Sequence, residues 1–526
     1  MTKKMLLSGV ALAGLLPHAS LAQDVFVLDD IVISANVVPQ EINRTGASVE
    51  VLSLGELVEG PLTVTDALDF QPGVSFSANG GIGSVATVRV RGLSSQYLGV
   101  RIDGIDVADP SAPQTQFDFG GLTTSDLGRI ELVKGPQSAL YGSEAVAGVV
   151  DITTFRGTGE DGVSGQISAE VGSFGFVNGS LGVASRAERG GLAFNISRLT
   201  TQGISARAGD DERDGFDQTF LSLTGDYLVT DNVELGFSAF YRDSDIEIDS
   251  SSADNSGENF SEQIGARVFA SFDLFGGEHT LSYSYFDIER RDPGGFATEF
   301  NGDREQIAYL GTFNTDIGIL SFGLDRTEES IDNSFEAGST TIYSVFSELL
   351  APVNDDIDLA ASVRLDDNSN FGQNVSGRLA VAWQVAPETT VRAVAGSGFR
   401  APAPVEQFAS FGNPDLEVER SYTLELGVEQ RFGSRGSIEV TGFYTEIDNL
   451  IDFDGAAAFC GSGFGCFVQS TGTTISQGVE VLGSYALTDR IDLFGSYTYT
   501  DAETEDVRLV RVPKHDIVLG LSLIHI

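Results

Sequence analysis

The chain has 526 residues and a formal net charge of -45, because 76 acidic residues stand against 31 basic ones. Hydrophobic residues make up 41% of it and 62 residues are glycine, so the composition is too apolar for an acidic disordered chain. The acidic excess argues against nucleic acid as a partner. We expect the acidic residues to concentrate in solvated loops.

The N-terminus has the pattern of a secretory signal peptide. Two lysines precede an apolar run from Met5 to Leu16, and Ser20-Leu21-Ala22 supplies the small residues that a signal peptidase reads. This predicts a signal peptide over residues 1–22 and export of the chain. The run is too short to span a bilayer, and no later run reaches the ~20 apolar residues that a membrane helix needs. Any membrane insertion must therefore use strands.

A short β-prone segment, Asp29–Ala35, follows soon after the predicted cleavage site. Acidic residues precede its apolar core, so it could add as an extra strand to the sheet edge of another protein. The pattern fits equally well the first strand of the following domain.

From about Val49 the chain alternates short strands with one helix start. Thr63 or Thr65 can cap a helix that Pro72-Gly73 ends. A glycine-rich loop over residues 79–84 precedes the strand Thr87–Val90. Further on, Asp106–Phe119 is a polar loop broken by prolines, and such loops on a rigid scaffold often carry binding residues.

The stretch Arg129–Thr154 combines two apolar strands with a compact glycine-rich turn. By itself it fits the core hairpin of any α+β domain. Its order and spacing resemble the end of the plug domain in TonB-dependent outer-membrane receptors, and two more plug-like strings lie upstream. These strings are Arg89-Val90-Arg91-Gly92 and Ile102-Asp103-Gly104-Ile105. The resemblance implies an α+β plug domain over residues 37–156.

Beyond a linker at 157–162, strands of roughly ten residues repeat with a period of two. In Val233–Tyr241 apolar residues alternate with polar or small ones, and only Phe240 interrupts the pattern. Short connections such as 230–232 alternate with long polar ones such as Ser244–Ser261 and Gly398–Val418. A soluble β-sandwich would not alternate its connections so regularly. The pattern predicts a lipid-facing barrel with a polar interior.

The predicted fold is a transmembrane antiparallel β-barrel over residues 157–526 with the plug domain inside it. We count about nineteen strands between Val163 and Leu523, whereas receptors of this kind have about twenty-two. We therefore expect about three C-terminal strands to be missing. The barrel should then not close, since an open strand edge leaves backbone groups unpaired in hydrocarbon.

Cys460 and Cys466 are the two cysteines of the chain. In an exported protein a disulfide across an extracellular loop tip is the favoured interpretation, and a metal pair is the weaker one. The four histidines are scattered, so no Ser-His-Asp or zinc arrangement is indicated. We expect no enzymatic activity.

Charged residues stand among the apolar residues of the plug strands, with Arg91, Arg129 and Glu131 as the main examples. One interpretation is an alternating strand with one solvated face. We favour a charged cluster where the plug meets the inner wall of the barrel, because buried charges must be paired.

Within the family, the plug and barrel strings most resemble those of the vitamin B12 (cobalamin) receptors. The resemblance implies TonB-dependent import of cobalamin across the bacterial outer membrane, with a ferric siderophore as the alternative ligand and a passive porin or adhesin as weaker alternatives. The expected partners are TonB with its inner-membrane complex, the imported ligand and membrane lipid, and the receptor should be a monomer. Residues 23–36 would carry the TonB box, formed by Asp30, Ile31, Val32, Ile33, Ser34 and Ala35.

The resemblance also carries over two sets of site residues. The corrinoid contacts of the plug fall on Val85, Thr87, Ser94, Ala112 and Pro113. The calcium-binding loops correspond to Asp210, Asp211, Glu212, Asp214 and Asp249. Calcium accepts several carboxylate oxygens in flexible geometry. Arg213 and Ser205 depart from this pattern, and a solvated acidic loop without calcium is the alternative.

Overall fold

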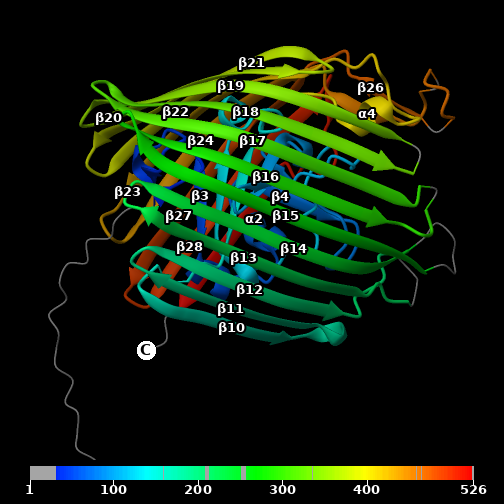
Figure 1. Ribbon diagram of the computed structural model, residues 1–526, viewed down its shortest axis with the longest axis horizontal. Helices are drawn as coiled ribbons and strands as arrows, with labels where there is room; N and C mark the ends of the chain where they lie inside the picture. Colours follow the sequence, from blue (N-terminus) through cyan, green and yellow to red (C-terminus); the bar gives the residue numbers. More distant parts are fainter. Residues whose placement is uncertain are drawn as a thin grey trace, which may run out of the picture.

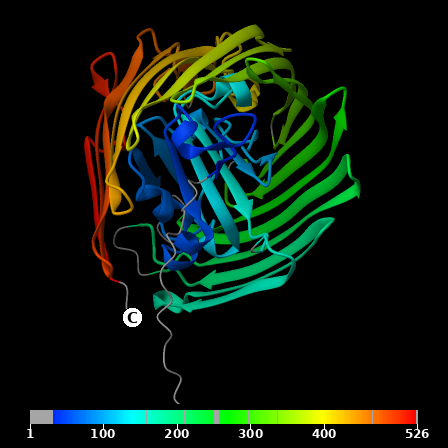
Figure 2. The same cartoon turned by 90° about the vertical axis from the view of Figure 1, so that its left-hand side faces the viewer.

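The computed structural model describes residues 31–157, 159–207, 212–249, 256–295, 297–334, 336–457, 459–463 and 465–523. A large antiparallel sheet curves around a smaller set of strands and short helices from the N-terminal part of the chain (Figure 1). Viewed along the barrel, the blue and cyan plug elements lie inside the curved sheet (Figure 2). The predicted fold, a β-barrel with an α+β plug inside it, is confirmed.

The large sheet has nineteen strands in antiparallel pairings. They are β10 Gly162–Val171, β11 Val177–Ala187, β12 Gly190–Thr201, β13 Phe216–Thr230, β14 Val233–Asp249, β15 Ser256–Leu274, β16 Gly277–Arg291, β17 Glu299–Thr315, β18 Gly318–Asn333, β19 Ala337–Asn354, β20 Ile357–Asn368, β21 Gly372–Ala386, β22 Thr389–Arg400, β23 Glu419–Arg431, β24 Gly436–Asp448, β27 Thr474–Thr488, β28 Ile491–Thr504, β29 Val507–Arg508 and β30 His515–Leu523. Within this sheet β24 pairs with β27, and β28 pairs with both β29 and β30. Among the described residues no pairing joins β10 to β30, so the sheet is open there. The predicted strand count is confirmed.

Alternation along each strand separates a lipid-facing side from an inner side. In β14 the residues Leu235 and Phe237 are 49% and 36% exposed. Ser238, which lies on the inner face of the same strand, is 5% exposed. Phe240, which interrupts the sequence pattern, is buried against the plug. The apolar outer side and the polar inner side match a barrel in lipid.

Several strands extend further than the sequence pattern predicts. The stretch Ser244–Ser261 was expected to be a loop, but β14 continues to Asp249 and β15 begins at Ser256. The connecting residues 250–255 lie outside the described part of the chain. Polar residues here still alternate between two faces, so a ladder can form without an apolar side. No helix in the described part of the chain has the length and apolarity to cross a bilayer.

The plug contains a five-stranded sheet in the order β3-β8-β9-β6-β7. Its strands are β3 Val49–Ser53, β6 Leu98–Ile102, β7 Ile105–Asp106, β8 Leu127–Lys134 and β9 Gly148–Thr154. Only β6 and β9 pair in parallel. Two more pairs lie beside it, β1 Ile31–Val32 with β2 Gln40–Glu41, and β4 Val74–Ala78 with β5 Ala86–Val90. β3 and β7 are therefore the two edges of the plug sheet.

Short helices connect these strands. They are α1 Leu54–Glu59, α2 Val64–Asp69 and α3 Ser138–Tyr141, with 3-10 turns η1 Ile42–Arg44, η2 Ser95–Tyr97 and η3 Thr124–Asp126. Thr63 is the residue that caps α2, since its hydroxyl accepts a hydrogen bond from the backbone of Asp66. Apolar residues of the strands and helices form one core that also includes Phe220, Phe240 and Phe286 of the barrel.

Outside the barrel wall, α4 Pro404–Phe408 and the hairpin of β25 Ile451–Asp454 and β26 Cys466–Gln469 lie at the end with the long connections. A further 3-10 turn, η4 Ser173–Gly175, joins β10 to β11. Cys460 and Cys466 are joined by a disulfide beside this hairpin. Phe453 and Phe467 of the hairpin pack against each other and against Phe411.

Candidate ligand-binding cavity and the contacts of the plug

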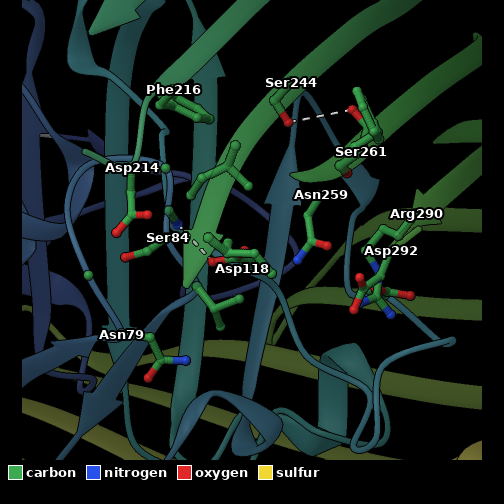
Figure 3. A pocket seen from close by; sticks show the side chains of 18 of the residues that line it. Asn79, Ser84, Asp118, Asp214, Phe216, Ser244, Asn259, Ser261, Arg290 and Asp292 are labelled. Carbon is green, nitrogen blue, oxygen red and sulfur yellow. Dashed lines mark hydrogen bonds and ion pairs between the residues drawn. The ribbon is translucent and has the colours of Figure 1, made fainter. Parts of the chain in front are cut away.

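A cavity of about 1080 Å³ lies between the plug and the barrel wall formed by β13 to β17. Ser84 and Asp118 of the plug and Asn259 and Arg290 of the barrel surround the same space (Figure 3). The plug contributes two loops, residues 79–85 and 107–120, and the barrel contributes the strand ends next to the long connections. A cavity of this size, open at that end, can hold a bulky ligand.

Close contact with one aromatic ring shapes the first plug loop. Gly83 has a φ of +93°, and a Cβ atom built on it would lie 2.1 Å from the ring of Phe216. Only glycine fits such a position without displacing the ring. The loop therefore lies directly against the β13 end of the barrel wall.

Asp118 fixes the end of the second loop. Its carboxylate accepts hydrogen bonds from the backbone N–H groups of Ala86 and Gly120, each at 2.9 Å. Burial raises the pKa of Asp118, and the two N–H donors hold it lower than burial alone would. The two plug loops are thus tied together by one side chain.

The structure brings three of the five expected corrinoid contacts to this cavity, namely Val85, Ala112 and Pro113. Thr87 and Ser94 are not among the described residues that line the cavity, and their role as ligand contacts stays a prediction. Thr87 lies within β5 and pairs with Ser77 on β4. Ser94 precedes the 3-10 turn η2, which leads into β6.

Three of the five expected calcium ligands gather at the edge of the cavity. One carboxylate oxygen each from Glu212, Asp214 and Asp249 lies within 4.8 Å of the other two. Asp214 also accepts a hydrogen bond from the backbone of Ala206 at 2.7 Å. Asp210 and Asp211 lie outside the described residues. Carboxylate oxygens at this spacing suit a calcium ion.

Arg213, which interrupts the acidic stretch in the sequence, contacts two residues outside the cluster of carboxylates. Its guanidinium bonds Gln202 and lies over the ring of Phe174, 5.8 Å from the ring centre. A positive charge beside the carboxylates competes with a cation, and these two contacts hold part of the Arg213 side chain elsewhere.

The segment that carries the expected TonB box is docked on the plug. Glu131 of β8 accepts hydrogen bonds from the backbone N–H groups of Ile33 and Ser34, both at 3.0 Å, and from the Ser34 hydroxyl. Arg129 donates to the backbone oxygen of Ile31 and pairs with Glu131 at 2.7 Å. Asp30 lies outside the described residues.

This arrangement corrects part of the predicted charged cluster. Arg129 and Glu131 were expected to face the barrel wall, but they bind the N-terminal segment instead. Side chains alternate along β8, and the strand lies next to the edge strand β3. The face that carries Arg129 and Glu131 is covered by residues 31–35, for which the sequence left open both a strand added to another protein and a strand of the plug itself.

Arg91 does lie where the plug meets the barrel. Its guanidinium pairs with Glu425 of β23 at 2.8 Å and with Glu480 of β27 at 2.9 Å, and all three side chains are buried. Lys134 joins the same cluster through Glu480 and through Glu50, each at 3.0 Å. Burial lowers the pKa of Lys134, but the carboxylates of Glu480 and Glu50 outweigh it and raise the pKa. The sequence did not point to Glu425, Glu480 or Glu50 as partners of Arg91 and Lys134.

Comparisons with known proteins agree with this architecture. The family model of the TonB dependent receptor-like β-barrel matches residues 159–525, and the model of the TonB-dependent receptor plug domain matches residues 41–149. The vitamin B12 transporter BtuB of Photobacterium profundum is 29% identical over 540 residues, which cover 99% of this chain and 86% of that protein. An iron-regulated outer membrane virulence protein of Vibrio cholerae is 26% identical over 574 residues, covering 98% and 85%.

Among solved structures, the siderophore receptor PirA of Acinetobacter baumannii superposes with a TM-score of 0.75 at 17% identity, covering 89% of this chain and 82% of the other. At that identity the likeness concerns the fold. Both matched domains together span most of the chain, and the relatives are outer-membrane proteins. The chain therefore belongs to the TonB-dependent receptor family and is an outer-membrane transporter.

Proposed function

We propose that this receptor imports cobalamin. The observation that carries the proposal is the chemistry of the cavity between the plug and β13 to β17. Neutral hydrogen-bonding side chains line much of it, namely Asn79, Ser84, Gln116, Ser244, Asn259, Ser261 and Gln263. A corrin ring carries carboxamide groups around its rim, and such groups pair well with amides and hydroxyls. The similarity to vitamin B12 transporters supports the same ligand.

The charge of the cavity disfavours the alternative, a ferric siderophore. The described lining contains six carboxylates, Asp109, Asp118, Asp214, Glu247, Asp249 and Asp292, and four guanidinium groups, Arg207, Arg242, Arg290 and Arg291. The net charge of these ten groups is -2. Two of the arginines are already engaged, since Arg290 pairs with Asp109 and Arg242 bonds Gln218. With the proposed calcium ion on Asp214 and Asp249 the sum becomes zero, so the cavity offers an anionic iron complex no net attraction.

The N-terminal part of the receptor would couple import to the energy that TonB supplies. We infer that residues 1–22 are a signal peptide, that 23–36 hold the TonB box, that 37–156 form the plug and that 157–526 form the barrel. Residues 31–35 would leave Glu131 and Arg129 when ligand binds, and TonB would then pair with them as an added strand. No hydrolysis takes place in the receptor under this proposal.

Calcium would order the mouth of the cavity. Glu212, Asp214 and Asp249 repel one another without a cation, and an ion shared among them would fix the two connections that carry them. Because Asp214 and Asp249 also line the cavity, this ordering would reduce the entropy lost when the ligand binds.

Calorimetry of the purified receptor tests which ligand it binds. We expect cyanocobalamin to bind and a panel of ferric siderophores of different charge not to bind. Tight binding of a siderophore without binding of cyanocobalamin would establish the alternative. Deletion of Asp30–Ala35 should stop uptake of labelled cyanocobalamin while leaving its binding intact, whereas uptake that survives the deletion would refute TonB-dependent import.

A further inference from the structure

A second cavity lies against the same barrel wall, at the end with the short connections. It has a volume of about 430 Å³ and is lined on the plug side by Asp103 and Arg156. On the barrel side it is lined by residues near the turns that join β11 to β12 and β13 to β14. In this family's orientation the short turns face the periplasm. The first cavity faces outward and the second inward, and both lie along β13 to β15.

One plug segment separates the two cavities. Residues 105–121, here called the strap, consist of β7 and the loop that follows it. The strap begins next to Asp103 in the inner cavity, and Val107 to Gly120 supply much of the plug lining of the outer cavity. Moving the strap away from the wall would join the two spaces into one passage.

Between the cavities the strap is sealed to the wall by apolar side chains. Phe220, Phe240 and Phe286 project inward from β13, β14 and β16, and their neighbouring ring centres are 6.2 and 6.3 Å apart. Ile105, Val107, Phe117 and Phe119 of the strap belong to the same buried cluster. Apolar contacts of this kind exclude water, yet they are not directional, so they can separate and re-form.

Polar barrel side chains also hold the strap. Arg304 of β17 bonds Asp106 and the backbone oxygen of Ala108, and Arg290 of β16 bonds the side chains of Asp109 at 2.8 Å and Ser111 at 3.1 Å. At the other end of the strap two further barrel side chains donate to backbone oxygens. Arg242 of β14 bonds Gly120, and Gln218 of β13 bonds Gly121 at 2.8 Å.

Only a few bonds attach the strap to the rest of the plug. The N–H of Val107 donates to the oxygen of Val100 at 3.1 Å, the N–H of Phe119 donates to the oxygen of Ala86 at 3.2 Å, and Asp118 accepts from the N–H of Ala86. β7 is an edge strand and pairs with β6 through only two residues, Ile105 and Asp106. The turn before it contains Asp103 and Gly104, which both have positive φ angles, of 50° and 79°. An edge strand can leave a sheet without disturbing the other four strands. The turn is thus a place where the strap could pivot.

We propose that the ligand crosses the receptor along the β13–β16 wall, when the strap leaves that wall and joins the outer cavity to the inner one. The inner cavity then becomes the exit end of that passage. This proposal rests on the proposed import function. It leaves the contacts of the plug with the opposite wall, β20 to β22, in place during transport.

Two matched disulfide tethers test the route, each joining a plug serine to a barrel glycine. A Cβ atom built on Gly302 of β17 lies 3.1 Å from the backbone nitrogen of Ser111 in the strap, and one on Gly398 of β22 lies 2.7 Å from the Ser138 hydroxyl. The pair S111C with G302C ties down the strap, and S138C with G398C ties the plug to the opposite wall. Both are made in a background with Cys460→Ser and Cys466→Ser, and mass spectrometry verifies each disulfide.

Uptake and binding of labelled cyanocobalamin are measured for both tethers, before and after reduction. We expect the strap tether to lower uptake about tenfold or more, with recovery on reduction, as expected when a gating motion is blocked. Binding should stay unchanged, and the opposite tether should leave uptake intact. Equal uptake by the two tethered receptors, or loss only with the opposite tether, overturns the route. Failure of the untethered receptor to take up cyanocobalamin at all refutes the proposed function instead.

A second pair of variants tests the strap without any ligand. R290A with R304A removes two residues that hold the strap, and R364A with R392A removes two that reach the plug backbone at Leu140 and Thr45 from the opposite wall. In a strain lacking TonB, the first variant should let vancomycin through the barrel and so make the cells more sensitive to vancomycin. The second variant should not change their sensitivity. Equal sensitivity of the two variants, high or low, contradicts the proposal that the strap is the gate.

Discussion

The carboxylate of Glu131 accepts hydrogen bonds from both the backbone N–H and the hydroxyl of Ser34, 97 positions earlier in the chain. Ser34 is 1% exposed and its backbone oxygen accepts a further bond from the Tyr141 hydroxyl at 2.8 Å. Glu131 and Tyr141 therefore hold Ser34 on the plug from two sides of its backbone.

Glu131→Gln should release this segment in the absence of ligand. The amide keeps the size of the side chain but loses the charge that strengthens bonds to the two backbone N–H groups and leaves Arg129 unpaired. A cysteine at Ile33 should then react faster with a membrane-impermeant thiol reagent from the periplasmic side. Asp151→Asn is the control, because Asp151 lies opposite Glu131 on β9. Equal reaction rates in the two variants would show that Glu131 does not hold the segment.

Arg91→Ala should weaken docking of the plug in the barrel by about 3–5 kcal/mol, because Glu425 and Glu480 would be left buried without their partner. The urea concentration at which trypsin begins to cleave the plug measures this change. Adding Glu480→Gln to Arg91→Ala should restore part of the loss, since one uncompensated charge is removed. A double variant that is less stable by the full sum of the two single effects would contradict the coupling.

Docking of the plug should weaken as the pH rises from 4 to 8 because of Asp126. Burial raises the pKa of Asp126 from 3.8 to about 7, although hydrogen bonds from Ser197 and Thr123 lower it. A carboxyl with a raised pKa binds its proton more tightly in the docked state, so its contribution is complete below pH 4 and is lost as the pH rises through 7. At about 1.4 kcal/mol per pKa unit the effect is up to about 4 kcal/mol.

The same urea and trypsin assay, repeated between pH 4 and pH 8, measures this dependence. Asp126→Asn should flatten it, because the amide does not titrate. Asp66→Asn, on the first turn of α2, serves as the control. An unchanged pH profile in Asp126→Asn would show that other groups cause the dependence.

Cyanocobalamin affinity should fall in EGTA and recover with calcium but not with sodium of equal charge. Asp214→Asn together with Asp249→Asn should remove the calcium dependence, since each loses one ligand oxygen of the cluster. Asp292→Asn is the matched control, because Asp292 lines the same cavity outside the cluster. Equal affinity of the unmodified receptor with and without EGTA would remove calcium from the proposal and leave import unaffected.

Local patterns in the sequence were enough to predict that barrel strands exist and that a helix begins after Thr63 or Thr65, but not how far the strands extend. The period of two identifies which residues of a barrel strand face inward, and the glycine-rich string Arg129–Thr154 indicates the plug. Phe240 shows the limit of this reasoning. It interrupts the alternation, and only the structure shows that it packs on the plug as part of an apolar seal.

The partners of the charged residues could not be predicted in the same way. Arg91 and Glu480 are 389 positions apart, and their contact depends on how deeply the plug lies in the barrel. The roles of Arg129 and Glu131 depend on which chain segment covers one face of β8. Alternation along a strand tells which residues share a face, but it does not tell what lies against that face.

The strand order β3-β8-β9-β6-β7 allows the plug sheet to transmit a force from one edge to the other. The N-terminal segment is attached next to one edge and the strap forms the other, with four strand spacings of about 4.8 Å between the two edges. Under the proposed import mechanism, traction applied at Ile31 would reach the strap across the strands, through rows of backbone hydrogen bonds. Work done in the periplasm would then displace the barrier beneath the ligand without loading the ligand itself.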